Sequence, residues 1–340
     1  MGQCRQGNRL FQAPLSGQSP SSRRFIASLI MPLRPEIKAI LDAMPPERTL
    51  DVTGLSLEVA VAKLRSRPAA PVRIESPVAT EDRFIDGPGG KVPLRLYRPG
   101  VGAVPGALVH LHGGGWVLGS IAQDDLYCHR MAMSTGCLVV SVDYRLAPEY
   151  PFPAPLEDCF CAVSWVADHL QELDVECSTV AISGFSAGGN LAAAVALRAA
   201  ELKRPKICAQ LLFYPICDSA LDTVSYREFS SGYYLNRADM RFFWDCYCND
   251  ERQRAHPHAS PLRAAKVNGL PRAMVVTAEC DVLRDEAKAY ADRLAAAGVP
   301  TIYRQVAGVV HGFVRMTPDA SWVKDAIDEA SSFIRESFPT

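Results

Sequence analysis

Short runs of alternating or continuously apolar residues recur along the chain, and stretches with a helical spacing of apolar positions separate them. The runs that predict strands lie at residues 82–86, 92–98, 106–111, 137–143, 179–184, 207–213, 272–278 and 301–306. The helical stretches between the later runs lie at 124–134, 156–170, 187–201, 284–297 and 320–336. Strands and helices that alternate in this way form a mostly parallel sheet with helices on both faces. The pattern therefore predicts an α/β fold.

The N-terminal part of the pattern differs from the rest in its first two strands and in the two helices before them. No helix separates the first two strands, so we expect an antiparallel edge there. Two short amphipathic helices precede them, one with apolar positions from Ile37 to Met44 and one from Leu57 to Leu64. We assign residues 31–80 to these N-terminal helices, and 81–216 together with 262–340 to the α/β domain.

The stretch from 217 to 261 lies between two strands and is too long for a simple crossover. It is rich in aromatic residues, namely Tyr226, Phe229, Tyr233, Tyr234, Phe242, Phe243, Trp244 and Tyr247. One interpretation is an amphipathic helix at the edge of the core. The other is a cap that walls a pocket, which we favour because active-site lids are typically insertions of this kind.

The N-terminal 35 residues contain five arginines, no acidic residue and many small polar residues. Such a composition buries too little apolar surface to offset the entropy of ordering. Arg23 and Arg24 precede a short apolar stretch as in an export signal, but Pro32 interrupts it and no cleavage motif follows. We expect residues 1–30 to be disordered or an extension ahead of a natural start at Met31.

Composition and charge exclude several functional classes. The chain has 340 residues, 48% of them hydrophobic, and a net charge of -1 with acidic and basic residues interspersed, so a nucleic-acid partner is not expected. No apolar run approaches the roughly 20 residues of a membrane span. The odd number of cysteines, 11, in a chain of this length favours free thiols and a cytoplasmic location.

A metal site is not expected from the spacing of the cysteines and histidines. Cys159 and Cys161 are two residues apart, as are Cys246 and Cys248, and the sequence has no C-x-x-C. The histidines at 256 and 258 flank a proline with no second pair of ligands nearby. We therefore expect neither a metal nor another cofactor.

A G-x-S-x-G motif occupies residues 184–188, where a predicted strand ends and a helix begins. In a nucleophile elbow the serine is held in a tight strand-to-helix turn, and the flanking glycines avoid collisions with the neighbouring backbone. The pentapeptide alone is a weak signal, but its placement makes it a strong one. Ser186 is the candidate nucleophile.

A serine nucleophile needs a histidine base that a carboxylate holds in place, and in this arrangement the chain order is Ser, Asp or Glu, then His. Asp281 follows the strand at 272–278, and His311 follows the strand at 301–306. His311 is the only histidine after Asp281. Asp285 and Glu279 remain alternatives for the acid, but Asp285 falls inside the next helix and Glu279 points to the other side of the strand end.

Three successive glycines, Gly113 to Gly115, follow the strand at 106–111. A turn without side chains can aim its amides at a ligand, and together with the amide of Ala187 these groups form a candidate oxyanion hole. By itself a triple glycine is often only a flexible turn. The neighbouring elbow favours the functional interpretation.

These segments together resemble the hormone-sensitive-lipase-like group of esterases (bacterial family IV) over residues 83–315. The matching stretches are HGGGW at 112–116, DYRLAPEYPFPAPLEDC at 143–159, GFSAGGN at 184–190, the cap-like 225–247, SPLRA at 260–264, GLP at 269–271, AECDVLRDEAKAYADRL at 278–294, AGVP at 297–300 and GVVHGF at 308–313. The resemblance implies an α/β-hydrolase fold with an eight-stranded, mostly parallel sheet. It also implies that the N-terminal helices join residues 217–261 in a helical cap.

The resemblance further implies a triad of Ser186, Asp281 and His311, with oxyanion amides from Gly114, Gly115 and Ala187. Two positions depart from the family pattern. Phe185 stands where many members have Asp, which removes a carboxylate from near the pocket, and Val282 stands where many have Pro. Neither change affects the elbow or the assignment of the acid.

We expect bulky aromatic side chains to wall the substrate pocket, namely Trp116, Phe185, Tyr226, Tyr233, Phe242 and Phe243. The function that follows is a serine carboxylesterase acting on small short- to medium-chain acyl esters, without a cofactor. A non-catalytic receptor is an alternative, because plant gibberellin receptors look like this family, but they lack the triad histidine that is present here. An amidase or a lactonase could use the same triad, and a homodimer is left open.

Overall fold

The computed structural model describes residues 33–45, 52, 54–66, 74 and 76–338, all of which lie in the unit formed by residues 32–340. The prediction for residues 1–30 lies outside the described residues. Within them, no helix is both long enough and apolar enough to cross a membrane.

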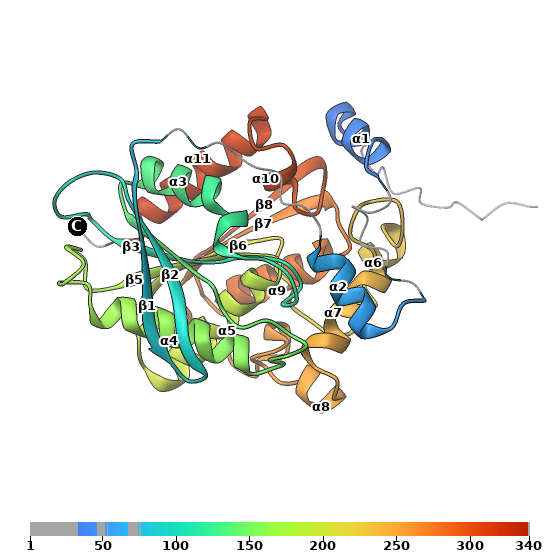
Figure 1. Ribbon diagram of the computed structural model, residues 1–340, viewed down its shortest axis with the longest axis horizontal. Coiled ribbons are helices and arrows are strands. Elements are labelled where there is room, and N and C mark those ends of the chain that lie inside the picture. The colour runs from blue at the N-terminus through green and yellow to red at the C-terminus, as the bar shows by residue number, and fades with distance from the viewer. Residues whose placement is uncertain (1–32, 46–51, 53, 67–73, 75, 339–340) are drawn as a thin grey trace, which may run out of the picture. The chain divides into compact units, whose positions relative to one another are not determined.

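Eight strands form one sheet in the order β1-β2-β4-β3-β5-β6-β7-β8 (Figure 1). Their bounds are β1 Ala79–Gly87, β2 Gly90–Arg98, β3 Ala107–Leu111, β4 Leu138–Val142, β5 Val180–Phe185, β6 Ile207–Phe213, β7 Arg272–Cys280 and β8 Thr301–Val310. β1 pairs with β2 and β2 with β4 in antiparallel fashion, and the remaining pairs are parallel. The predicted α/β fold, with an antiparallel edge, is confirmed.

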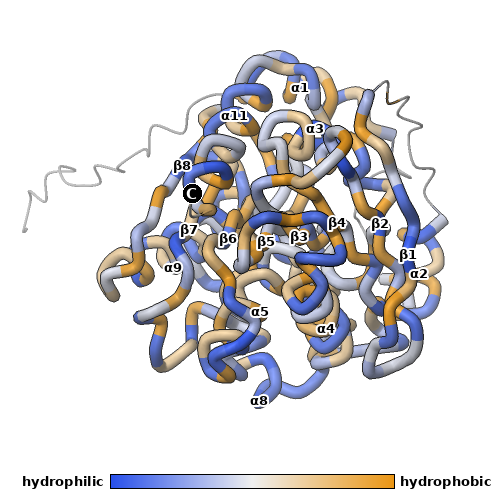
Figure 2. The backbone as a smooth tube through the Cα atoms, turned by 90° about the vertical axis from the view of Figure 1, so that its left-hand side faces the viewer, coloured by the Kyte–Doolittle hydropathy of each residue, from blue (hydrophilic) through white to orange (hydrophobic). Residues whose placement is uncertain are grey.

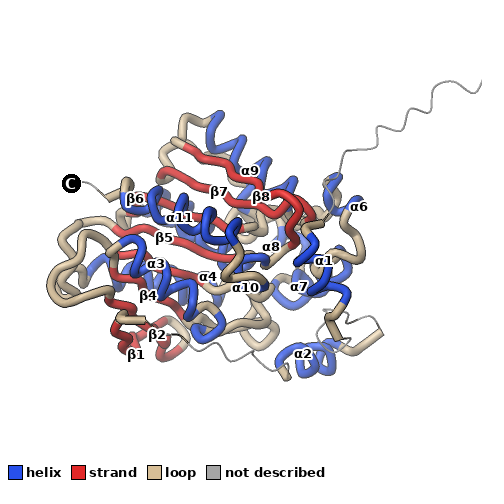
Figure 3. The backbone as a smooth tube through the Cα atoms, turned by 90° about the horizontal axis from the view of Figure 1, so that it is seen from above, coloured by secondary structure: helices blue, strands red, loops and turns tan. Residues whose placement is uncertain are grey.

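Helices cover both faces of the sheet (Figures 1 and 3). On one face α3 (Asp125–Thr135) packs against α11 (Ser321–Arg335). On the other lie α4 (Ala154–Asp168), α5 (Ala187–Leu202) and α9 (Arg284–Ala296). α5 contacts β3, β5 and β6, and its alanine-rich sequence lets its backbone lie close to these strands.

The core lies along the central strands, every residue of which is buried in β3, β4 and β5. Their apolar side chains colour this part of the tube as largely hydrophobic in Figure 2. Strands buried on both faces need continuous rather than alternating apolar sequence, as in the Leu138–Val142 run. β3, β5, β7 and β8 run parallel, so their carboxyl ends lie at the same edge of the sheet. The segments that follow these four strands therefore meet at that edge.

The insertion between β6 and β7 is helical, with α6 (Val224–Glu228), α7 (Arg237–Tyr247) and α8 (Glu251–Arg254). α7 begins in a capping box: the Asn236 side chain accepts from the amide of Asp239, and the Asp239 carboxylate accepts from the amide of Asn236. The two N-terminal helices are α1 (Pro35–Asp42) and α2 (Leu57–Arg65). That these helices act as a cap, and the domain limits with them, stays a prediction.

Three short elements complete the order, namely η2 (Ile121–Gln123) after β3, η3 (Pro261–Arg263) before β7, and α10 (Phe313–Met316) after β8.

Candidate active site

Ser186 lies in the turn between β5 and α5, with φ 55° and ψ -114°. This positive φ is strained for a residue with a side chain, and such strain is typical of a nucleophile elbow. The turn is held in place because the amide of Ser186 donates to the carbonyl of Phe213 at 2.9 Å. The side chain is therefore presented at the carboxyl edge of the sheet.

The glycines of the elbow are required by close approach rather than by their own φ angles. A Cβ on Gly188 would lie 2.0 Å from the carbonyl oxygen of Leu111, and one on Gly184 would lie 2.2 Å from that of Gly188. Both distances are far below contact with backbone atoms that cannot move independently. The G-x-S-x-G pattern thus allows α5 to start directly beneath the end of β3.

His311 follows β8 and connects the other two candidate triad residues. Its Nε2 lies 3.0 Å from Oγ of Ser186, and its Nδ1 lies 2.7 Å from Oδ2 of Asp281. Asp281 is 1% exposed and its second oxygen accepts from the amide of Leu283 at 3.0 Å. The structure thus brings all three predicted triad residues into one hydrogen-bonded chain.

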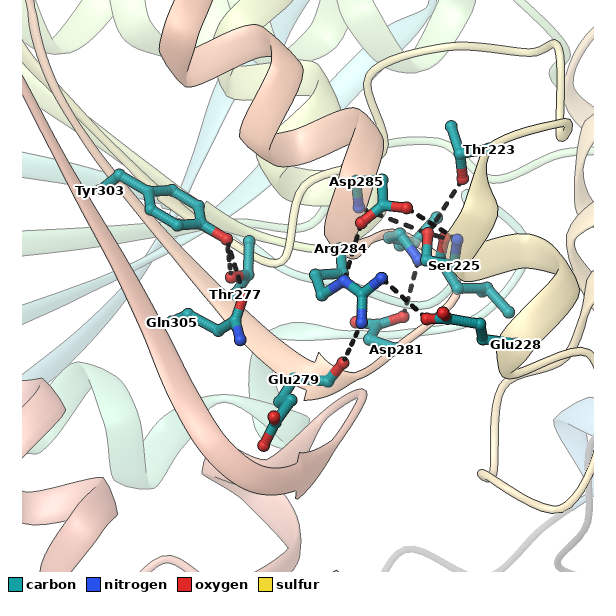
Figure 4. A network of polar contacts seen from close by, with 12 residues as sticks. Thr223, Ser225, Glu228, Thr277, Glu279, Asp281, Arg284, Asp285, Tyr303 and Gln305 are labelled. Atoms are coloured by element: carbon teal, nitrogen blue, oxygen red, sulfur yellow. Dashed lines mark hydrogen bonds and ion pairs between the residues drawn. The ribbon is translucent and has the colours of Figure 1, made fainter. Parts of the chain in front are cut away.

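The two alternative acids have other partners. Glu279 accepts from the amide of Gly308 at 2.7 Å and so ties the ends of β7 and β8 together. Asp285 accepts from the amide of Ser225 at 2.7 Å and from Nε of Arg284 at 2.7 Å. Figure 4 shows Asp285 turned toward Ser225 of α6, with Arg284 as its other partner. Of the three carboxylates, Asp281 holds His311.

The triple glycine follows β3 and adopts conformations that favour glycine, with φ 130° at Gly114 and 61° at Gly115. Within the described part of the chain, the amides of Gly114, Gly115 and Ala187 have no hydrogen-bond acceptor. His112 precedes the turn, stacks on Tyr144 at 4.1 Å and is fully buried. Burial lowers the pKa of His112 to about 4, so the imidazole stays neutral beside these free amides.

A cavity of about 650 Å³ opens over the candidate triad and is lined by Ser186, His311, Gly114 and Gly115. Its apolar wall consists mostly of aliphatic side chains, namely Leu64, Ile74, Leu118, Leu126, Leu146, Leu235, Met240 and Met316. α2 from the N-terminal part and α7 from the insertion thus contribute to the same wall. A volume of this size is typical of a site for a small organic ligand.

Comparison with known proteins identifies the family to which the chain belongs. The family described as the alpha/beta hydrolase fold matches residues 108–315. The chain belongs to this family. Within the α/β-hydrolase family it falls in the hormone-sensitive-lipase-like group, since its relatives and structural neighbours are esterases of that group.

An arylesterase from Saccharolobus solfataricus is 38% identical over 285 residues, which are 84% of this chain and 93% of that protein. The carboxylic ester hydrolase LipN of Mycobacterium tuberculosis is 36% identical over 84% of this chain and 71% of its own length. Among solved structures, a thermostable esterase from Pseudomonas putida superposes with a TM-score of 0.83 at 34% identity, covering 91% of this chain and 99% of that one.

The aromatic residues that we expected to wall the pocket of this α/β hydrolase mostly lie elsewhere. Phe243 lines the cavity, but the other five do not: Trp116, Phe185, Tyr226, Tyr233 and Phe242. Trp116 is fully buried, and its ring stacks on that of Tyr247 at 4.2 Å. Of the six predicted residues only Phe243 is confirmed; Tyr214 and Tyr234 also line the cavity, and the rest of its apolar wall is aliphatic.

The remaining four of these side chains fill the core or pack at its edge. Phe185 is fully buried between His110 and the ring of Tyr127. Tyr226 is fully buried next to Glu286. Tyr233 packs on the ring of Phe229, and Phe242 packs on that of Phe243.

A group of polar residues beside the elbow of this hydrolase was not predicted from the sequence. His110 on β3 places Nδ1 2.9 Å from Oγ of Ser183 and Nε2 3.0 Å from Asp124. Asp124 is 1% exposed and pairs with Arg315 of α10 at 2.8 Å. No motif joins these positions, because they belong to four different segments. Arg315 and its neighbour Gln123 both line the cavity.

Proposed function

We propose that this protein is a carboxylic ester hydrolase that cleaves short- to medium-chain acyl esters through a covalent acyl-enzyme on Ser186. The observation that supports this most directly is the hydrogen-bonded chain from Ser186 through His311 to Asp281 at the base of the cavity. The esterase names of the relatives point to the same chemistry. No residue of the proposal requires a metal or an organic cofactor.

In the first half of the reaction, Oγ of Ser186 attacks the ester carbonyl while Nε2 of His311 removes the hydroxyl proton. The carbonyl oxygen becomes negative, and the free amides of Gly114, Gly115 and Ala187 are suited to stabilise it. Gly113, the first residue of this turn, is also part of the proposed oxyanion hole. The intermediate then collapses, the protonated imidazole gives its proton to the leaving alcohol oxygen, and the acyl group remains on Ser186.

In the second half, a water molecule takes the place of the alcohol. Nε2 of His311 accepts a proton from the water as its oxygen attacks the acyl carbon. The second tetrahedral intermediate releases the carboxylic acid and returns the proton to Oγ of Ser186. Asp281 keeps the Nδ1–H of His311 pointed at its carboxylate throughout, so that Nε2 is free to act as the base in both halves.

The wall of the cavity supports a preference for acyl chains of limited length. Each methylene that packs against aliphatic residues such as Leu235 and Met240 contributes about 0.8 kcal/mol, so kcat/KM rises with the first added carbons. A chain that outgrows the cavity meets packed side chains, and overpacking costs about 1 to 3 kcal/mol. We expect the maximum near butanoyl or hexanoyl esters, with little action on long-chain triglyceride emulsions.

The test is a plate of 4-nitrophenyl esters from acetyl to palmitoyl, run beside the matching anilides. We expect ester turnover with a maximum at short to medium chains, slow anilide cleavage, and none of this turnover in Ser186→Ala. Intact-mass measurement during turnover should show the wild-type chain carrying one acyl group and Ser186→Ala carrying none.

Three outcomes would contradict the proposal. Tight ligand binding without turnover would indicate a receptor, and anilide rates matching ester rates would indicate an amidase. Ester turnover that still rises with chain length up to the palmitoyl ester would contradict a cavity of limited length for the acyl chain.

A further inference from the structure

Arg315 presents an unused hydrogen-bond donor to the cavity. Its Nε lies 2.8 Å from Oδ1 of Asp124, and its Nη1 donates to Oε1 of Gln123 at 3.1 Å. Within the described residues, Nη2 has no acceptor. About a third of the side chain, 32%, is accessible, and Arg315 lines the same cavity as Ser186. A ligand in this cavity can therefore reach an N–H group of a held guanidinium.

The unused group lies beside the first glycine of the candidate oxyanion turn. A Cβ built on Gly113 would lie 2.7 Å from Nη2 of Arg315 and 2.9 Å from the carbonyl oxygen of Phe185. Gly113 starts the oxyanion turn, and Phe185 directly precedes the nucleophile. Nη2 thus lies close to Gly113 at the start of the candidate oxyanion turn, and Arg315 itself lines the cavity that contains Ser186.

A second arginine of the cavity provides the contrast. Arg65 donates from Nε to the carbonyl of Val117, and from Nη1 and Nη2 to the carboxylate of Glu149 at 2.7 and 2.8 Å. Nη2 of Arg65 also donates to the carbonyl of Ala147 at 3.0 Å. Each of its nitrogens is occupied by protein, so Arg65 has the same charge as Arg315 but a different capacity for a ligand.

The charge of Arg315 is balanced by a neighbour rather than left for an anion. Asp124 is buried with a side-chain exposure of 0% and faces the guanidinium directly. Burial acts to lower the pKa of Arg315, but Asp124 raises it, so the guanidinium stays charged. Asp125, which also lines the cavity, is itself paired with Arg95. A substrate carboxylate would lose its hydration to bind beside Arg315 and Asp124, whose charges already balance each other. A neutral oxygen loses much less hydration free energy when it binds there.

We propose that Arg315 forms a polar subsite that selects esters carrying a neutral hydrogen-bond acceptor, such as a ketone, ether or hydroxyl oxygen, a few bonds from the scissile carbonyl. This inference rests on the proposed esterase function and names the class of substrate that the site takes. The aliphatic wall contacts the carbon skeleton, and Nη2 of Arg315 donates a hydrogen bond to the one polar atom. The acceptor can stand on the acyl or on the alcohol side of the ester.

The test compares three butyl esters whose acyl groups have nearly the same shape: 4-oxopentanoate, 4-methylpentanoate and succinate with one free carboxylate. Turnover is followed by acid release in a pH-stat. A second pair, 2-methoxyethyl and butyl butanoate, places the acceptor on the alcohol side. We expect wild-type kcat/KM to favour the neutral acceptor over its hydrocarbon counterpart in at least one pair, and 4-oxopentanoate over succinate.

The variants are Arg315→Lys, which keeps a positive charge near Asp124, and the double variant Arg315→Met with Asp124→Asn, which leaves no buried charge unpaired. Dividing the acceptor rate by the hydrocarbon rate cancels intrinsic reactivity and general loss of activity. We expect this ratio to fall roughly tenfold in both variants, as for the loss of a charge-assisted hydrogen bond. Arg65→Lys is the matched control and should leave the ratio as in the wild type.

The proposal is overturned if neither ratio changes in the Arg315 variants, if Arg65→Lys changes them equally, or if succinate is the best of the three acyl groups. A change in only one ratio supports the subsite and assigns the acceptor to that side of the ester. Failure of the proposed function looks different, because then a folded wild-type protein would hydrolyse none of the five esters.

Discussion

Replacing Asp281 by Asn tests the assignment of the acid with a change of almost no volume. Asp281 accepts from Nδ1 of His311 at 2.7 Å and from the amide of Leu283 at 3.0 Å. An Asn can keep one oxygen for Leu283, but it then presents an NH2 group to Nδ1. The imidazole must move its proton to Nε2, which can no longer accept the proton of Ser186. The base is lost although the packing is kept.

The expected loss follows from the role of the tautomer. The wrong tautomer lowers kcat by about 10⁴-fold in a Ser-His-Asp enzyme, which corresponds to about 5 kcal/mol of transition-state stabilisation. Asp285→Asn is the matched control, since Asp285 contacts Ser225 and Arg284 but not His311. It weakens the link between α6 and α9 (Figure 4), so we expect a loss of about 1 to 2 kcal/mol in stability but less than tenfold in kcat.

The assay is kcat on 4-nitrophenyl butanoate for both variants, with melting temperatures measured in parallel. Equal losses of kcat, or a larger loss in Asp285→Asn, would refute the assignment of the acid. A collapse of the melting temperature in Asp281→Asn alone would show that Asp281 acts through stability rather than through the tautomer.

Two further predictions concern stability. The pKa of His112 is about 4 in the folded chain and 6.5 for a free histidine, so between these pH values only the unfolded chain binds the proton. The free energy of unfolding should therefore fall by about 3 kcal/mol for this group as the pH drops from 6.5 to 4. Urea unfolding of wild type and His112→Asn at pH 7 and 4.5 measures this; an equal pH dependence of both would contradict it. Gly188→Ala should prevent folding or activity because its Cβ would lie 2.0 Å from a backbone oxygen, whereas Gly189→Ala, with 3.0 Å to Pro215, should cost far less. The measurement is the expression level and melting temperature of the Gly188→Ala and Gly189→Ala variants. Similar values for both variants would contradict the prediction and show that the end of β3 can move away from the added Cβ.

The parts of the site that could be predicted from sequence are those that depend on strand ends. Ser186, Asp281 and His311 each follow a strand, and parallel strands bring such segments to one edge of the sheet. The rejection of Asp285 also followed from local pattern, because it falls within the first turn of α9. Periodicity and chain order were sufficient for these residues.

The positions that could not be predicted depend on the direction of single side chains or on pairing across distant segments. Trp116 stacks on Tyr247 instead of lining the cavity, and no periodicity reveals this direction. Phe185 ends a strand whose residues are all buried, so alternation could not tell which way it points. The pairing of Asp124 with Arg315 joins residues 191 positions apart, and neither stands in a motif.

Chemistry and substrate choice are carried by different parts of this chain. The groups that we propose to react come from the ends of strands β3, β5, β7 and β8, whose positions are fixed by the sheet. Most of the cavity wall comes from α2, α7 and the loops, where a change of side chain leaves the sheet unaffected. Arg315 is different, because it follows His311 by four residues and is held by a buried carboxylate. Substitutions in α2 or α7 should therefore alter which carbon skeleton fits, whereas substitutions at Arg315 should alter which polar group is accepted.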